Sequence, residues 1–501
     1  MSTLGLRKAV AIWFFAVYVF VGVPLWYKLT TIYRAPLPIE HIRSMHENPH
    51  TDLHLVIPVY VRSDTYNFPD VHDAIQVQVN ELLKSKKGPL TWSLQVLPFE
   101  SWVNEESDYV VTLALDNFIG YTIPYDSKET IVFFNDESVV ANDIPFFVAQ
   151  TLIEHTFGLE WQHFSESKDV IKETNNNMAI SYTPNVHLSI SLLTGDGRPV
   201  AWDIVPTLEE YFTPLRRFIS PLVNFTVDTG IVYYNDLKLG SLSGSDTASW
   251  QDLSHTVDLS ELSSMNYYSE RTVLNLAIVF PGHSAGNLSF INSTSKHDWQ
   301  SFLVPQWGVL VINKSPLPDS TRLTKDYLTP IIYKFSRELF QLLGLATQAA
   351  DLSTPYVTID SFKRLMIIRN LDESTETLWS LVKLVEQFPQ MAVPEEVLVN
   401  VRKALDLRLQ VAELINDPFK GGDAVWNQAL LLSNELFRVC EDAFFHKEMV
   451  QQNFFPQEHK IAVYLPLLGP LTVIMLSGLV NAFKRKQKEE SSAEKDQDVK
   501  E

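Results

Sequence analysis

Cys440 is the only cysteine of the chain, and its thiol is a candidate nucleophile. Paired with His446 or His459 as a general base, it would form a Cys–His arrangement for covalent catalysis. The residues before it, Phe437-Arg438-Val439, follow a helical pattern and offer no strained turn that would present donors to an oxyanion. We therefore predict that Cys440 is a small apolar residue on a helix. The alternative function is a membrane-tethered hydrolase or transferase whose own active site contains Cys440.

The other motif matches are weaker. Gly240-Ser241-Leu242-Ser243-Gly244 is similar to the nucleophile turn of serine hydrolases, but leucine occupies the position of the serine. His155 and His163 lie eight residues apart on one expected helix, too far apart to share a metal ion without a bend. Gly195-Asp196-Gly197 predicts a turn, because Arg198-Pro199 does not begin a helix as a phosphate-binding loop requires. The sequence predicts no catalytic residue, no metal site and no cofactor site.

Two uncharged apolar runs lie near the ends of the chain. Residues 9–27 (AVAIWFFAVYVFVGVPLWY) would form a helix of about 28 Å, close to the ~30 Å core of a bilayer. A cleaved signal peptide is the alternative, but the run ends in bulky residues and lacks a small-residue cleavage site. Residues 461–483 would span about 34 Å. Pro466 and Pro470 interrupt this second run, and either a neighbouring helix covers the freed carbonyls or the kink has no role.

The charges beside these runs predict their orientation. Arg7 and Lys8 precede the first run, and residues 484–488 (KRKQK) follow the second, so the positive-inside rule places both termini in the cytosol. The expected division is as follows: cytosolic N-terminus 1–8, transmembrane helix 9–27, luminal mixed α/β domain 28–350, luminal helical section 351–460, transmembrane helix 461–483 and cytosolic charged tail 484–501.

Sequons support a luminal location for the middle of the chain. Asn224, Asn287 and Asn292 each begin an Asn-x-Ser/Thr sequence within the expected luminal region, and we predict N-glycosylation there. Asn313 also begins a sequon, but Pro316 follows it directly and weakens it.

Composition excludes several classes of protein. The hydrophobic fraction of 46% fits a globular chain, not a fibrous or disordered one. The net charge of −20 argues against a general polyanion binder, so no nucleic-acid partner is expected. Residues 28–483 hold 54 acidic and 32 basic side chains, so the acidity belongs to the expected luminal part.

Hydrophobic periodicity predicts a mixed α/β or α+β sheet domain followed by helices. The expected strands are 54–61, 91–96, 108–115, 130–134, 186–193, 225–234, 272–280 and 307–312, with helices over 71–83, 143–164, 208–218 and 327–343. Beyond about residue 361 the strand signal ends, and three helices are expected over 362–388, 394–415 and 423–445. No internal repeat is evident.

A series of short motifs resembles the PIG-S family of GPI transamidase subunits, in matching order along nearly the whole chain. The motifs are 24–28 (PLWYK), 31–38 (TIYRAPLP), 202–204 (WDI), 224–228 (NFTVD), 231–234 (IVYY), 273–275 (VLN), 305–308 (PQWG), 443–445 (AFF), 455–456 (FP) and 460–467 (KIAVYLPL). Of the three predicted sequons, the one at Asn224 falls inside such a motif.

The resemblance implies a non-catalytic accessory subunit of the GPI transamidase in the endoplasmic reticulum membrane. That enzyme attaches preassembled GPI anchors to precursor proteins in the lumen. In the family a separate caspase-like subunit carries the catalytic cysteine and histidine, so no catalytic residue is transferred to this chain. The implied partners are the other transamidase subunits and membrane lipid, with precursor protein or GPI lipid as further candidates.

Overall fold

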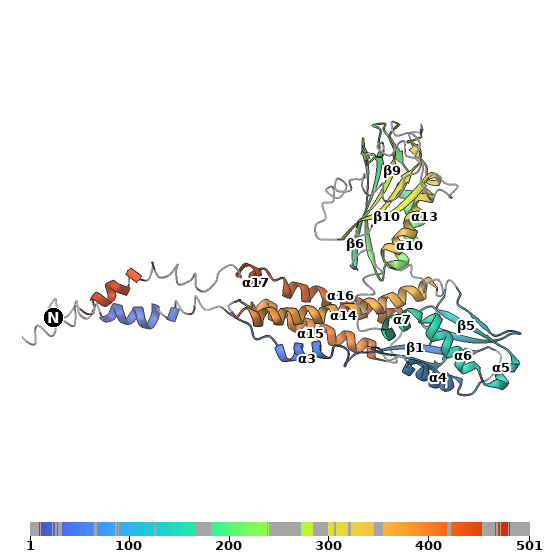
Figure 1. Cartoon of the computed structure of the whole chain (residues 1–501), viewed down its shortest axis with the longest axis horizontal. Helices are drawn as coiled ribbons and strands as arrows, with labels where there is room; N and C mark the ends of the chain where they lie inside the picture. Colours follow the sequence, from blue (N-terminus) through green and yellow to red (C-terminus); the bar gives the residue numbers. More distant parts are fainter. Residues whose placement is uncertain are drawn as a thin grey trace, which may run out of the picture. The chain divides into compact units, whose positions relative to one another are not determined.

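The computed structural model describes the chain from residue 10 to residue 480 with gaps (Figure 1). The described residues are 10, 12–22, 24–25, 28, 33–64, 68–85, 88, 90–124, 127–166, 182–237, 239, 272–283, 299–304, 307–318, 322–344, 354–389, 391–417, 422–452, 466, 469–470, 472–478 and 480. They form two compact units. Residues 48–373 and 406–437 make the first, which we call the sheet unit. Residues 1–47, 374–405 and 438–501 belong to the second, the helical unit.

The first sheet of the sheet unit has five strands in the order β2-β1-β3-β5-β4. Its strands are β1 His54–Ser63, β2 Thr91–Pro98, β3 Tyr109–Leu115, β4 Gly120–Thr122 and β5 Glu129–Phe134. All neighbours are parallel except the edge strand β4, which runs antiparallel to β5. Alternate residues of β2 and β5 are buried, as expected for a sheet with one well-covered face. Helices α4 (Val71–Ser85) and α6 (Ile144–Thr151) pack together, and α4 also packs on β2.

The second sheet repeats this topology. Its strands are β6 Asn185–Thr194, β8 Asn224–Tyr233, β9 Thr272–Phe280, β10 Trp299–Val304 and β11 Gly308–Asn313. The order is β8-β6-β9-β11-β10, again parallel except for the fourth strand in sequence, which is an antiparallel edge. Helix α13 (Lys325–Leu342) packs on β11 and β10 and on the helical stretch between β6 and β8. That stretch consists of α9 Ile204–Thr207, η3 Leu208–Phe212 and α10 Thr213–Ile219; a small pair of strands, β7 Ala201–Trp202 and β12 Arg322–Leu323, completes this part.

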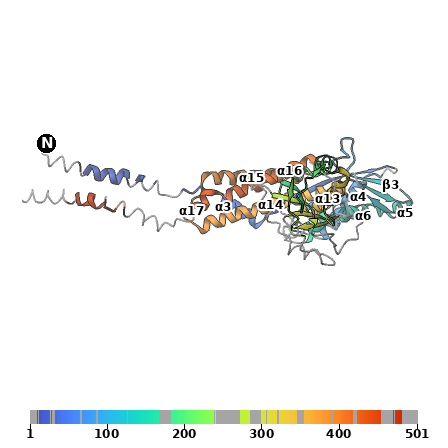
Figure 2. The same cartoon turned by 90° about the horizontal axis from the view of Figure 1, so that it is seen from above.

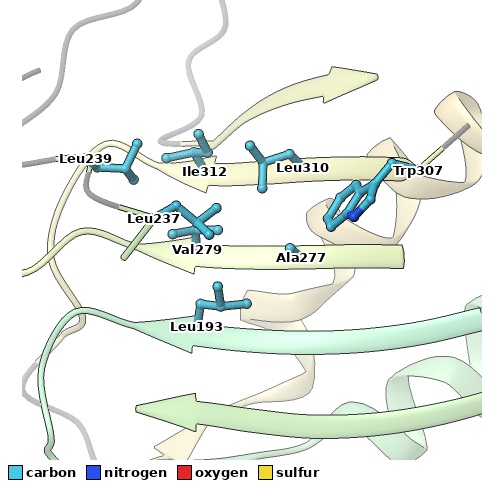
Figure 3. Close-up of a cluster of buried hydrophobic side chains, with 8 residues drawn as sticks. All are labelled: Leu193, Leu237, Leu239, Ala277, Val279, Trp307, Leu310 and Ile312. Atoms are coloured by element: carbon cyan, nitrogen blue, oxygen red, sulfur yellow. The ribbon is translucent and has the colours of Figure 1, made fainter. Parts of the chain in front are cut away.

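Each of the two sheets has its own hydrophobic cluster, and in each the connection after the second strand in sequence contributes to it. In the first, the connection from β2 to β3 adds Val103 to Tyr60 of β1 and Val110 of β3. In the second, the connection after β8 adds Leu237 and Leu239 to side chains of β6, β9 and β11 (Figure 3). Those side chains are Leu193, Ala277, Val279, Leu310 and Ile312, with Trp307 just before β11. The same strand order therefore occurs twice, and each sheet has a cluster that includes residues of the corresponding connection. No repeat is evident in the sequence.

The helical section follows the sheets as predicted. Its three long helices are α14 Pro355–Gln387, α15 Glu395–Asn416 and α16 Asp423–Phe444. Two shorter helices, α3 Ile39–Glu47 and α17 Lys447–Gln452, were not predicted. Within the sheet unit, α14 and α16 contact each other where Asn370 Nδ2 donates to Ser433 Oγ at 3.0 Å.

In the helical unit, the segment around α3 is tied to α14 and to the start of α15. Ala35 N donates to Val393 O at 2.9 Å, and Val393 N donates to Tyr33 O at 3.1 Å. Arg43 bonds Glu386 of α14 at 3.0 Å, and His46 stacks on Trp379 with ring centroids 5.0 Å apart. The N-terminal part of the chain is thus fastened to the C-terminal helices.

Every predicted strand and helix in the sheets is confirmed, with two refinements. The helix expected over 143–164 contains a π-helical turn, η2 Leu152–Thr156, between α6 and α7 (Gly158–Glu166). The helix expected over 208–218 is η3 followed by α10. The short strands β4, β7 and β12, the edge strand β10 and helix α5 (Asp136–Ala141) were missed.

The apolar ends are described only in part. Residues 12–17 and 472–478 are α-helical, and η1 Tyr18–Gly22 is a π-helical turn. In the part of the chain that the structure describes, no helix is both long enough and apolar enough to cross a membrane.

Candidate functional site

Cys440 lies on α16 as predicted, and its surroundings argue against a role as a nucleophile. Its side chain is fully buried, and burial raises the pKa of the thiol to about 12. A neutral, inaccessible thiol is a poor nucleophile, because the thiolate is the reactive form. One of its two candidate bases, His446, has Nε2 3.1 Å from Glu396 Oε2, and the other, His459, lies outside the described residues. The geometry does not favour the Cys440 alternative.

The two helical histidines do not form a site together. His155 lies within the π-helical turn η2, and His163 lies on the following helix α7. His155 stacks on Tyr121 of β4 with ring centroids 4.5 Å apart, whereas His163 is buried on α7. Among the described residues, no three histidine, cysteine, aspartate or glutamate side chains are grouped so that they could hold a metal ion.

The predicted turn at Gly195-Asp196-Gly197 is confirmed, and the structure adds partners from distant turns. Asp196 Oδ2 is 2.5 Å from His283 Nδ1, which follows β9, and Arg198 Nη2 is 3.3 Å from the other ring nitrogen of His283. A Cβ at Gly195 would lie 2.4 Å from Gly282 N, so only glycine fits there. This position, at the carboxyl ends of β6 and β9 where the strand order reverses, is where doubly wound sheets bind ligands. Here the polar groups bind one another and brace two turns.

A buried polar cluster among the described residues was not predicted from the sequence. Arg364 of α14 and Glu160 of α7 are both fully buried, with Arg364 Nε donating to Glu160 Oε1 at 2.7 Å. Arg364 Nη1 and Nη2 also donate to the Tyr109 hydroxyl, at 3.1 and 3.2 Å. The guanidinium carbon lies 5.3 Å from the centre of the Trp426 ring. Strand β3 and helices α7, α14 and α16 therefore meet around one cation.

Asp360 continues the cluster one turn earlier on α14. The Asp360 carboxylate accepts hydrogen bonds from the Tyr109 hydroxyl at 3.1 Å and from Lys363 Nζ at 3.0 Å. Lys128 Nζ forms an ion pair with the same carboxylate at 2.5 Å. Lys128 also pairs with Asp423 of α16. Three buried cations thus face the buried carboxylates of Glu160 and Asp360 and the partly exposed carboxylate of Asp423.

Electrostatics keep the carboxylate of Asp360 ionised. Burial alone would raise the pKa of Asp360, but Lys128, Lys363 and Arg364 outweigh it and hold the pKa below its ordinary value. Burial raises the pKa of Tyr109 well above its ordinary value. Both shifts move the pKa away from neutrality, so Asp360 and Tyr109 are unsuited to acid–base catalysis near neutral pH. It fixes α14 and α16 against the first sheet.

The sequons differ in accessibility. Asn224 is exposed at the first residue of edge strand β8, and Thr226 of the same sequon has Oγ1 2.9 Å from His187 Nδ1. Asn313 is buried, and its side-chain amide donates to the Tyr327 hydroxyl at 3.1 Å, which leaves no room for a glycan. Asn287 and Asn292 lie outside the described residues.

Comparison with known proteins gives consistent matches along the chain. Residues 13–489 match the family described as PIG-S, phosphatidylinositol-glycan biosynthesis class S protein. The chain is 61% identical over 500 residues to the GPI transamidase component GPI17 of Saccharomyces cerevisiae, covering 97% of this chain and 93% of that protein. It is 25% identical to the GPI transamidase component PIG-S homolog of Schizosaccharomyces pombe, over 95% of this chain and 84% of that protein. It is 24% identical to the human GPI-anchor transamidase component PIGS, with 97% of each chain covered.

Proposed function

The chain belongs to the PIG-S family, and from this membership we propose that it is a non-catalytic accessory component of the GPI transamidase. In this role it supports the attachment of preassembled GPI anchors to precursor proteins. The observation that carries the proposal is the match over residues 13–489, which includes nearly all of both apolar runs. A similarity of this extent indicates a shared architecture as well as a shared motif.

The described side chains support an accessory role. The single cysteine is buried, with the pKa of its thiol raised to about 12 by that burial. In the buried cluster, neighbouring charges keep Asp360 and Arg364 ionised by lowering the pKa of the first and raising that of the second. Binding surfaces and a rigid scaffold are what such a chain offers, and we assign the chemistry of the transamidase to another subunit.

We place the chain in the endoplasmic reticulum membrane with two spans, residues 9–27 and 461–483, both termini cytosolic and residues 28–460 in the lumen. The described parts of both runs are helical, and large apolar side chains on them face outward, such as Phe20 at 78% and Ile474 at 70% exposure. Apolar side chains exposed on helices suit contact with lipid. The luminal part would comprise the mixed α/β domain, 28–350, and the helical section, 351–460.

Glycosylation follows from this topology. Asn224 is exposed on an edge strand and is the best-supported acceptor, with Asn287 and Asn292 as further sites. The expected partners are the other transamidase subunits, the catalytic caspase-like chain among them, and membrane lipid. Direct contact with precursor protein or GPI lipid is a further part of the proposal.

Affinity purification of the tagged full chain from detergent-solubilised membranes tests the assignment. The other transamidase subunits should copurify, and cells that lack the chain should accumulate precursors without anchors. A chain that purifies alone, in cells whose GPI anchoring is normal after its deletion, would contradict the proposal.

A Cys440→Ser variant separates the accessory role from the enzymatic alternative. The variant should copurify with the other subunits and restore anchoring, because a buried neutral thiol contributes packing and not catalysis. Loss of anchoring with the complex intact would instead favour an active site on this chain.

A further inference from the structure

The two apolar ends of the chain meet through a hydrogen bond. The hydroxyl groups of Tyr18 and Thr472 lie 3.2 Å apart, although 454 residues separate them. Both residues belong to the helical unit. In both views the described helices of the two ends, blue and red, lie side by side (Figures 1 and 2).

The position of this contact matches the middle of a bilayer. Tyr18 is the central residue of the 9–27 run, and Thr472 is the central residue of the 461–483 run. The centre of a bilayer holds no water, so a hydroxyl there needs a partner within the protein. In this pair the two hydroxyl groups serve as hydrogen-bond partners of each other.

Burial along each run points to one contacting face. Phe15, Tyr18 and Gly22 are half-buried, and their spacing of three and four residues places them on one side of a helix. Gly469, Thr472 and Met475 are half-buried in the other run at spacings of three. Other large side chains of the two runs, such as Phe20 and Ile474, are exposed.

Backbone irregularities lie at the same level. The π-helical turn η1 begins at Tyr18. Pro466 and Pro470, six and two residues before Thr472, remove backbone donors from the second run. Both prolines are exposed and lie outside the half-buried face of Gly469, Thr472 and Met475.

We propose that the two membrane segments bind each other as an antiparallel pair, with the Phe15–Tyr18–Gly22 face of the first against the Gly469–Thr472–Met475 face of the second. The hydrogen bond between Tyr18 and Thr472 fixes the depth at which they meet. This inference rests on the proposed two-span topology. The pair would hold the luminal part from both of its ends as a single anchor.

Site-specific photocross-linking tests the pairing in the full chain in native membranes. A benzophenone amino acid at position 18 should cross-link within the chain to the peptide that contains residues 469–475. The same probe at Phe20, which is exposed, should cross-link to lipid or to other chains. Cross-linking from position 18 only to other chains or lipid would overturn the pairing.

A measurement of membrane topology in the same membranes distinguishes an error in the proposed pairing from an error in the two-span topology. Protease added to sealed vesicles should remove tags from both termini, which lie in the cytosol, without cleaving the luminal part. If both tags are removed and the cross-link goes elsewhere, only the pairing is wrong. If either tag is protected, the two-span topology itself is wrong.

Shape-conserving substitutions test the hydrogen bond. With the probe at Phe15, on the same face, Tyr18→Phe and Thr472→Val should each lower the intrachain yield about threefold, the effect of one interhelical hydrogen bond in lipid. The double variant should show no larger loss than either single variant, because one interaction is removed in each case. Additive losses, or no loss, would contradict a role for this bond.

Discussion

Arg364 of α14 and Glu160 of α7 form an ion pair in which both side chains are completely removed from solvent. The two residues are separated by 204 positions, so the pair joins the helical section directly to α7, the helix that follows the first sheet in the chain. Burying two charges is costly, and their attraction compensates only when the geometry is good and other hydrogen bonds satisfy the groups. The Tyr109 hydroxyl accepts hydrogen bonds from Arg364, and the Trp426 ring faces the guanidinium. Among the described residues, no hydrogen-bond partner reaches Glu160 Oε2.

Replacement of Arg364 by alanine should therefore be strongly destabilising. The Arg364→Ala variant leaves Glu160 buried without its counter-charge and opens a cavity, which predicts a loss of about 3–5 kcal/mol in the free energy of unfolding. Thermal unfolding of the purified complex, followed by tryptophan fluorescence, measures it, because Trp426 lies against the guanidinium.

An exposed arginine on a neighbouring helix provides the control. Arg438 pairs with Asp442 at 3.7 Å, and its side chain is 66% exposed, so Arg438→Ala should cost less than about 0.5 kcal/mol. Equal losses from both substitutions would contradict a special role for the buried pair. A double variant, Glu160→Leu with Arg364→Met, should recover much of the stability, because an apolar pair of similar size avoids the cost of burying charge.

The pH dependence of stability should reflect Asp360. Its pKa in the folded chain lies below the ordinary value of about 3.9, so its stabilisation is present above that value and is lost as pH falls through the folded pKa. Asp360→Asn should lower the melting temperature by a constant amount between pH 5 and 8. Below about pH 4 the difference between the two proteins should shrink. A difference that changes between pH 5 and 8 would mean that Asp360 titrates near neutrality.

The sequence predicted the fold well where the periodicity is strong. β9 and β11 are mostly apolar, and α4 has apolar residues at helical spacing, so each was found with bounds close to those observed. β4 and β12 have three and two residues, too few to show a period, and β10 is a partly exposed edge strand. The repeated topology was missed because strand order depends on tertiary pairing, and the equivalent clusters use different residues.

The polar cluster could be recognised only in part from sequence. Asp360, Lys363 and Arg364 stand in a stretch of α14 whose other residues from 357 to 371 are nearly all buried. Charged residues on a helix that is buried on all sides require partners. The apolar residues around them indicate such a helix, so the need for partners could be predicted from the sequence. The partners Glu160, Tyr109 and Lys128 were not predictable, because they come from elements far away in the chain.

Cys440 should resist thiol reagents in the folded protein. Because it is buried and the pKa of its thiol is raised to about 12, roughly one thiol in 10⁴ to 10⁵ would be ionised at pH 7.5 even if the reagent could reach it. Maleimide should label it only after denaturation, as read by mass spectrometry. Leu431→Cys, at a position 66% exposed on the same helix, should be labelled at once. Rapid labelling of Cys440 in the native complex would contradict its buried position.

Removal of sequons should distinguish exposed from buried acceptors. Asn224→Gln should raise the gel mobility of the chain by the amount that corresponds to loss of one glycan, because the Asn224 side chain is exposed on β8. Ser315→Ala destroys the sequon at Asn313 and should change nothing, because Asn313 is buried and bonded to Tyr327. Endoglycosidase treatment should abolish the difference between Asn224→Gln and the unmodified sequence. Unchanged mobility of Asn224→Gln would show that this site is not used.

The end of α14 should depend on Arg34. Its guanidinium donates to Val385 O, in the last turn of the helix, at 2.7 Å and to Pro389 O, just beyond the helix, at 2.8 Å. The first contact satisfies a carbonyl that the helix end leaves unpaired, and the positive charge lies at the negative end of the helix dipole. Arg34→Ala should lower local stability by about 1 kcal/mol, and Arg34→Lys by less, since lysine keeps the charge but cannot reach both oxygens in a fork.

Hydrogen exchange measures this effect locally in the intact complex. Peptides that cover residues 385–395 should exchange about fivefold faster in Arg34→Ala, because the backbone bridge between Tyr33 and Val393 lies beside the lost contacts. Arg43→Ala removes a partly exposed ion pair with Glu386 and should leave the amides around Val393 nearly unchanged. If the two variants accelerate exchange at Val393 equally, charge near α14 matters there and the two carbonyl contacts of Arg34 do not.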